Sequence, residues 1–140
     1  TSVERRLVNG VRGSLKNTDD EWAFWKKNDS IAVTIDVGVR KRLGKVTLGY
    51  LNHFGLGIHK PQKVEVWLSD NDVHYWKATE QTFGTDEIFA EGRFTEEMEF
   101  IFKDVARYVR VIMKGAGKCP EHHVRPGLEA QIYLDEVLIE

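Results

Sequence analysis

The amino-acid sequence predicts an all-β protein, either a sandwich or a barrel of short strands. Hydrophobic residues occupy alternate positions in several runs, as at 63–69 (Lys-Val-Glu-Val-Trp-Leu-Ser), and this alternation is typical of a strand with one buried face. Turn-forming residues separate these runs, for example at 55–57 and 70–72. Apart from a weak candidate in the N-terminal third, no stretch of ten or more residues has a helical period. Many short strands with irregular turns favour a sandwich or barrel.

The strands expected along the chain are rich in β-branched and aliphatic residues. They cover 32–37, 45–51, 63–69, 98–102, 109–113, 132–134 and 137–139. Side chains two positions apart share one face of a strand, so the alternating hydrophobic residues are expected to meet in one core. That core is expected to include Val64, Val66, Leu68, Phe100, Phe102, Val109 and Val111.

The composition is that of one soluble globular domain. The sequence has 140 residues, 41% of them hydrophobic and 30% charged, which fits a single folded core and argues against disorder. Its 20 basic and 22 acidic residues give a net charge of −2, which argues against a dedicated nucleic-acid-binding protein. No apolar run approaches the roughly 18 residues of a transmembrane span. The single cysteine, Cys119, excludes an intramolecular disulfide, and the start at Thr1 suggests a domain excised from a longer chain.

Four long connections are unusually rich in Trp, Phe, His, Arg and Gly. They cover 9–30, 52–62, 82–97 and 114–128. Connections longer than about 12 residues in a compact domain are commonly functional, and in a β-sandwich the rigid sheets carry such loops. We therefore expect the functional site on these segments.

A catalytic site is not favoured. Cys119 precedes His122 and His123, a combination that could form a Cys–His nucleophile pair or part of a zinc site. The spacing matches no closed zinc pattern, however, and adjacent residues of a strand point to opposite faces, so the two histidines are not expected to share an ion. The acids at 19–21 could supply a carboxylate for acid–base chemistry, but three consecutive acids near a turn are more often solvated. We expect no enzymatic activity from this chain alone.

Carbohydrate recognition suits the loop residues better. A sugar stacks its apolar face on an aromatic ring while a few placed polar groups bind its hydroxyls. Trp25 precedes the polar run 26–29 and is the expected stacking ring, whereas Trp22 is expected in the core. The expected hydroxyl partners are His53, His59, His122 and Arg125. In the alternative interpretation, Trp25 closes one end of the barrel and the histidines are solvated.

Seven short motifs follow one another along nearly the whole chain. They are 7–14 (Leu-Val-Asn-Gly-Val-Arg-Gly-Ser), Glu21-Trp22, 34–38 (Thr-Ile-Asp-Val-Gly), 61–66 (Pro-Gln-Lys-Val-Glu-Val), 68–72 (Leu-Ser-Asp-Asn-Asp) with Trp76, 106–111 (Ala-Arg-Tyr-Val-Arg-Val) and 135–137 (Asp-Glu-Val). In this order they resemble a discoidin domain, also called the coagulation factor V/VIII type C domain. The 117–120 segment and the Trp22-x-x-Trp25 stretch are most similar to the module appended to bacterial β-hexosaminidases (chitobiases).

The resemblance implies a galactose-binding-like jelly-roll β-sandwich that is not catalytic itself. It implies a single carbohydrate-binding domain over 1–140, which targets a covalently linked glycosidase catalytic domain to glycans containing hexose or N-acetylhexosamine. Such a protein is expected to be secreted, periplasmic or on the cell surface, with no nucleic-acid partner and no membrane partner. The alternative within the family is an adhesion domain that binds lipid or protein.

The resemblance also implies a structural calcium ion. The family's ligand positions correspond here to Asn9, Val11, Ser14 and Glu136. Calcium prefers six to eight oxygen ligands that include charged carboxylates. This chain has Asn, Val and Ser where the family has Asp, Asn and Thr, so one charge is lost and a weaker site is expected.

Overall fold

The computed structural model describes residues 23–25 and 30–140, and it is mostly antiparallel β-sheet. The strands are β1 (Ala23–Trp25), β2 (Ser30–His53), β3 (Lys63–Ser69), β4 (Trp76–Thr82), β5 (Arg93–Lys114) and β6 (Ile132–Ile139). The helical elements in this part of the chain are one 3₁₀ turn, η1 (Phe54–Leu56), and one short helix, α2 (Thr85–Ile88). The expected all-β jelly-roll class is confirmed.

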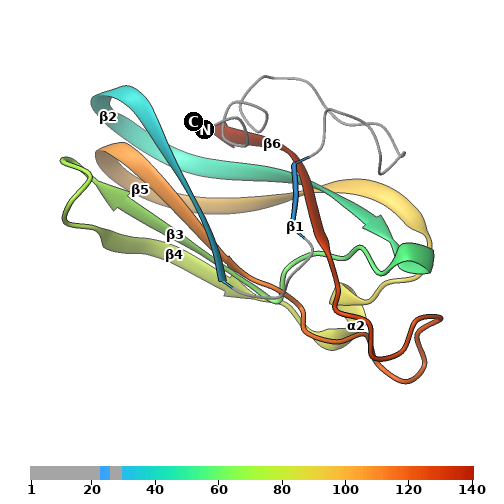
Figure 1. The fold of residues 1–140 in the computed structure, drawn as a ribbon. Helices are drawn as coiled ribbons and strands as arrows, with labels where there is room; N and C mark the ends of the chain where they lie inside the picture. Colours follow the sequence, from blue (N-terminus) through green and yellow to red (C-terminus); the bar gives the residue numbers. More distant parts are fainter. Residues whose placement is uncertain (1–22, 26–29) are drawn as a thin grey trace.

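Two long strands, β2 and β5, connect the two layers of the sandwich. β2 and β5 pair with each other along their length. The order of hydrogen-bonded neighbours among the six strands is β1-β6-β2-β5-β3-β4. One layer contains 30–36 of β2, 108–114 of β5, and then β3 and β4. The other contains 45–53 of β2 beside 93–101 of β5 on one side and β6 and β1 on the other. In Figure 1, β2 and β5 fold back on themselves at the same end of the molecule.

The fold-back of β2 is built from irregular pairing. The register with β5 shifts between Asp36 and Lys41 and again between Leu43 and Lys45. Bulges of this kind bend strands and let them pass from one sheet to the other. Gly38 lies within the first irregularity at φ 97°, a conformation that side chains disfavour. The Asp36 carboxylate accepts hydrogen bonds from the Gly38 N–H and, in bidentate fashion, from Arg107 of β5.

The Asp36–Arg107 pair predicts a measurable titration. Hydrogen bonds from Arg107 and the Gly38 amide lower the pKa of Asp36 from 3.8 to about 2. The folded state therefore favours the carboxylate, so this contact stabilises the fold above pH 3.8 and is lost as the pH falls through about 2. In the variant Arg107→Ala, we expect NMR titration to show the pKa of the Asp36 carboxyl rising toward 3.8, with the remaining Gly38 hydrogen bond still lowering it. An unchanged low pKa in that variant would contradict the assignment.

The core lies between the two layers and includes the residues expected from the alternation. Val64, Val66, Leu68, Val109 and Val111 are at most 1% exposed, and Phe100 is 3% exposed. Phe102 is half-buried and packs against the same cluster. The layer that contains 45–53 of β2 and all of β6 contributes Leu48, Ile132 and Leu134 to this cluster. One continuous core therefore joins the two sheets.

Three of the segments expected as long connections lie at the end of the sandwich opposite the fold-backs of β2 and β5 (Figure 1). The first two are shorter than expected because β2 extends to His53 and β5 begins at Arg93. The last one is longer and runs over 115–131, because β6 begins at Ile132. We call the segments 53–62, 83–92 and 115–131 the loop end. No helix in the described part of the chain is long and apolar enough to span a membrane.

Candidate functional site

Backbone hydrogen bonds hold the loop end together. His53 and Ile58 exchange both of their N–H···O bonds and so close a tight turn around η1. The His59 N–H donates to the Gln131 carbonyl, and the Gln131 N–H donates to the Gly57 carbonyl. The Phe54 N–H donates to the carbonyl of Gly92. The first segment is therefore fixed to both of the others by main-chain contacts, which makes a preorganised surface.

A buried chain of side-chain hydrogen bonds runs beneath this surface. The Asn52 amide donates to the carbonyls of Ala90 and Gly92, at 2.9 and 3.0 Å, which orients its oxygen toward His59. That oxygen lies 3.0 Å from His59 Nδ1, and His59 Nε2 lies 3.0 Å from His123 Nε2. The Arg125 backbone N–H donates to His123 Nδ1 at 2.9 Å.

One arrangement of protons satisfies every bond in this chain. The Asn52 oxygen can only accept, so His59 Nδ1 must carry a proton. His123 Nδ1 accepts from a backbone amide, so the His123 proton must lie on Nε2 and point at the bare Nε2 of His59. Both imidazoles are then neutral, and each nitrogen has a partner.

Burial keeps the two rings in this state. His59 is 1% exposed and His123 is 3% exposed, and the Phe54 and Phe89 rings pack against them. Loss of hydration lowers the pKa of His59 to about 4, helped by the neighbouring His123. Burial, with the charges of His122 and Arg125, also lowers the pKa of His123.

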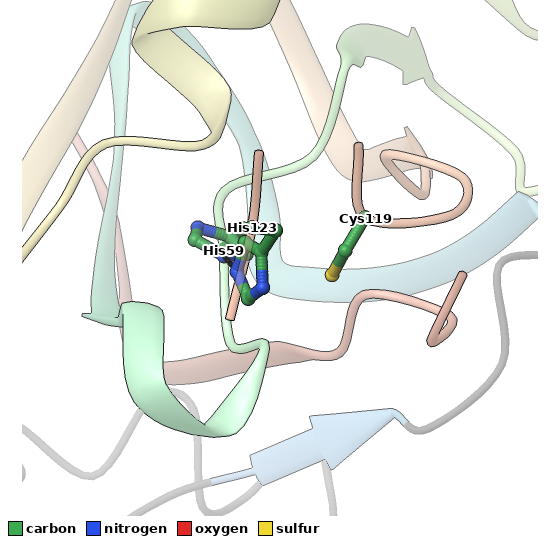
Figure 2. Close-up of side chains that lie close together, drawn as sticks. All are labelled: His59, Cys119 and His123. Carbon is green, nitrogen blue, oxygen red and sulfur yellow. Dashed lines mark hydrogen bonds between the residues drawn. The ribbon is translucent and has the colours of Figure 1, made fainter. Parts of the chain in front are cut away.

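Cys119 completes a compact group with the histidine pair. Its thiol is 3% exposed, and burial raises the pKa of that thiol. The ligand atoms of His59, Cys119 and His123 all lie within 4.8 Å of one another. Figure 2 shows the two imidazole rings in contact and the Cys119 side chain extending toward them.

A buried lysine supports the middle segment of the loop end. Lys60 is 5% exposed, and its ammonium group lies 2.6 Å from a Glu87 carboxylate oxygen of α2. The same nitrogen lies 3.9 Å from the centre of the Phe83 ring, a cation–π distance. The lysine thus ties the 53–62 segment to α2 through charge and ring contacts.

The structure brings several of the sequence-predicted sugar contacts to the loop end. His53 is half-buried, and its Nδ1 has no hydrogen-bond partner among the described residues. Burial, with the charge of Arg93, lowers the pKa of His53. Arg125 is exposed, and its Nε donates to the Gly55 carbonyl at 2.7 Å. His122 is exposed on the same segment. Sugar binding by these side chains stays a prediction.

Two of the predicted sugar contacts, His59 and Trp25, are not among the exposed or half-buried side chains described above. The His59 ring is buried with both nitrogens bonded, so within this structure it positions other groups and offers no nitrogen to the surface. The Trp25 backbone pairs with Ile132, the first residue of β6, directly after the 115–131 segment. The described part of the structure does not include the Trp25 side chain, and its stacking role stays a prediction.

The predicted calcium ligands are not tested by the described residues. Asn9, Val11 and Ser14 lie outside them. Glu136 lies in β6 opposite Gly49, and its side chain is outside the description. The calcium site therefore stays a prediction.

Sequence reasoning missed the central group of this end. The sequence pattern assigned no role to Asn52. A metal or catalytic site at Cys119 and His123 was not favoured, because the spacing matches no closed zinc pattern and adjacent residues of a strand point to opposite faces. The structure supplies the second imidazole from His59, which is 64 residues before His123. The sequence analysis grouped His59 with His122 and Arg125 as sugar contacts at the surface, but nothing in the sequence placed the His59 ring against His123 in the interior.

Comparison with known structures places the fold. No family model and no curated protein matches the sequence. The CBM32 of AlyQ, in complex with 4,5-unsaturated mannuronic acid, is similar at a TM-score of 0.62 and 14% identity, over 99% of this chain and 86% of that one. A His 62 mutant of the lectin-binding domain of lectinolysin, complexed with Lewis b, is similar at a TM-score of 0.60 and 21% identity. The match covers 97% of this chain and 81% of that one. The C-terminal domain of a chitobiase from Bacteroides fragilis is similar at a TM-score of 0.51 and 14% identity. The match covers 91% of this chain and 74% of that one.

These likenesses confirm the fold that the sequence motifs implied. The architecture is a jelly-roll β-sandwich, as in the CBM32 of AlyQ and the chitobiase C-terminal domain. Several of the similar structures are carbohydrate-binding modules or lectin domains complexed with glycans.

Proposed function

We propose that this domain is a non-catalytic carbohydrate-binding module that holds a glycan at its loop end. The observation that carries the proposal is the likeness of the whole fold to modules complexed with carbohydrate, over 99% of the chain for the CBM32 of AlyQ. Fold likeness alone does not fix a function. The chemistry of the loop end supplies the second support.

The loop end offers a rigid support with polar groups at its surface. Arg125 uses Nε–H to hold the Gly55 carbonyl, and its Nη groups make no hydrogen bond or ion pair with residues 23–25 or 30–140. Those groups form a planar set of donors suited to adjacent sugar hydroxyls. His122 lies exposed three residues before Arg125. The buried Asn52–His59–His123 chain holds the loops beneath them, which favours a preformed site.

The finer features of the proposal rest on the sequence resemblance. They are a covalently linked glycosidase of the β-hexosaminidase or chitobiase type, a secreted, periplasmic or cell-surface location, and calcium held by Asn9, Val11, Ser14 and Glu136. The expected ligands are glycans that contain hexose or N-acetylhexosamine.

A glycan array probed with this domain tests the proposal directly. We expect retention on a subset of hexose- or N-acetylhexosamine-containing glycans, and no co-sedimentation with liposomes. Liposome binding without glycan binding would favour the lipid-binding class of discoidin domain. Turnover of aryl glycosides by the isolated domain would overturn the non-catalytic assignment.

The variant Arg125→Ala should weaken binding of the best array glycan roughly tenfold or more. Hydrogen bonds from a charged donor contribute about 1.5–3 kcal/mol, and about 1.4 kcal/mol corresponds to a tenfold change in Kd. Titration calorimetry measures the change, with circular dichroism to check the fold. The matched control is Arg42→Ala, an exposed arginine near the fold-back of β2. Equal affinity of both variants and the parent would place the site elsewhere on the domain.

A further inference from the structure

The group of His59, His123 and Cys119 is not explained by glycan binding. All three side chains are at most 3% exposed, so none of them can reach a sugar at the surface in this structure. The thiol makes no disulfide. Two imidazoles and a thiol from two separate loops nevertheless meet at one point beneath the loop end.

The distances within the group are close to those of a zinc site. Two nitrogens bound to one tetrahedral zinc at about 2.0–2.1 Å are separated by roughly 3.3 Å. The two Nε2 atoms here face each other at 3.0 Å, within a few tenths of an ångström of that separation. The Cys119 sulfur lies within 4.8 Å of a ring nitrogen of each histidine. To bind the same ion at about 2.3 Å, the sulfur must approach by roughly 1 Å.

The surroundings of His59 are those of a metal-binding histidine. Such a histidine binds through one ring nitrogen and donates the N–H of the other to an oxygen, which fixes the ring. His59 donates Nδ1–H to Asn52, and the two carbonyls of the 90–92 segment hold that asparagine in turn. The free lone pair of His59 Nε2 points at His123 and is the one that a cation would use.

We propose that His59, His123 and Cys119 form a buried binding site for Zn²⁺, which cross-links the 53–62 and 115–131 segments beneath the loop end. Imidazole and thiolate ligands in a near-tetrahedral arrangement select a borderline-soft cation such as zinc over calcium or magnesium. Three protein ligands leave the fourth position for a water molecule or another small ligand.

Binding requires a defined movement of protons. The Cys119 thiol loses its proton to solvent and binds as thiolate. The His123 proton moves from Nε2 to Nδ1, which frees Nε2 for the metal. A protonated Nδ1 can no longer accept from the Arg125 N–H, so that hydrogen bond must open. One proton is released for each ion bound, and the Arg125 amide reports on the event.

Two variants distinguish Zn²⁺ binding at this site from nonspecific Zn²⁺ binding by surface histidines. Cys119→Ala removes only the sulfur and leaves the Asn52–His59–His123 bonds intact, so it should fold. His122→Ala, the matched control, removes an exposed imidazole three residues away on the same segment. Each protein is freed of metal with a chelator and then titrated with Zn²⁺ in millimolar calcium, so that any calcium site is filled.

We expect the parent and His122→Ala to bind one Zn²⁺ with micromolar affinity or better. Changes around metal ligands cost about 10–100-fold, so loss of the ligand itself in Cys119→Ala should weaken binding at least 100-fold. With Co²⁺, the parent and His122→Ala should show a thiolate-to-metal absorption band that Cys119→Ala lacks. The Arg125 amide resonance should shift on Zn²⁺ addition.

Three results would overturn the proposal. The first is no Zn²⁺ binding by the parent at these concentrations. The second is equal binding by Cys119→Ala, and the third is loss of binding in His122→Ala. In each case, His59, His123 and Cys119 would not together form the Zn²⁺ site. None of these outcomes bears on glycan binding, which the array tests separately.

Discussion

Replacing Asn52 with alanine should destabilise the metal-free protein by about 3–5 kcal/mol. Asn52 is 1% exposed, and its amide satisfies the carbonyls of Ala90 and Gly92 and the Nδ1–H of His59. The Gly92 carbonyl keeps the Phe54 N–H as a donor, but the variant leaves the Ala90 carbonyl and the His59 Nδ1–H without their partner. Each buried polar group left in this way costs about 1–3 kcal/mol. Urea unfolding followed by fluorescence measures the loss as a lower midpoint at an unchanged slope.

A surface amide provides the control for this variant. Gln81 is exposed on β4, so Gln81→Ala should change the free energy of unfolding by no more than about 0.5 kcal/mol. A loss below about 1 kcal/mol in Asn52→Ala would mean that the buried hydrogen-bond chain does not hold the three loops together.

The second large effect is expected in the core of the sandwich. Leu48 is fully buried in β2, where it pairs with Met98 of β5 and Val137 of β6. Truncating a buried leucine to alanine removes its burial and leaves a cavity, which costs about 2–5 kcal/mol. At the centre of a two-layer core with little room to collapse, Leu48→Ala should lie in the upper half of that range.

A leucine on the neighbouring strand tests whether the faces are assigned correctly. Leu138 of β6 is 39% exposed, one position along from Val137 and on the opposite face. Leu138→Ala should cost about 1 kcal/mol or less, since most of the benefit of burial is absent. Comparable losses in the two variants would contradict the register of β6 against β2.

The periodicity of hydrophobic residues was sufficient to predict the fold class and the core. Val64, Val66 and Leu68 alternate over a whole strand, and a period of two has only one structural interpretation when one face is buried. The edge strand β4 escaped prediction because its residues are mostly polar, as edge strands often are. The strands expected at 32–37 and 45–51 are one strand, because β2 bends through bulges and not through a loop.

The candidate site was predictable only in part. Alternation and turn residues located the loops, and the composition of those loops pointed to His53, His122 and Arg125, which lie at the loop end. The role of His59 was not predictable, because its burial depends on partners at Asn52 and His123 from other segments. Contacts between loops depend on how the sheets fold, and a linear spacing does not carry that information.

A glycan bound at the loop end of this jelly roll should change the surroundings of the backbone amides there. The most direct measurement is an NMR titration of the domain with the best array glycan, in which the chemical shifts of the backbone amides are monitored. We expect shifts concentrated in 53–62, 83–92 and 115–131, with Arg125 among the largest, and little change in β3 and β4. Shifts centred instead on the shallow depression between Lys63, Glu65 and Lys114 would contradict glycan binding at the loop end.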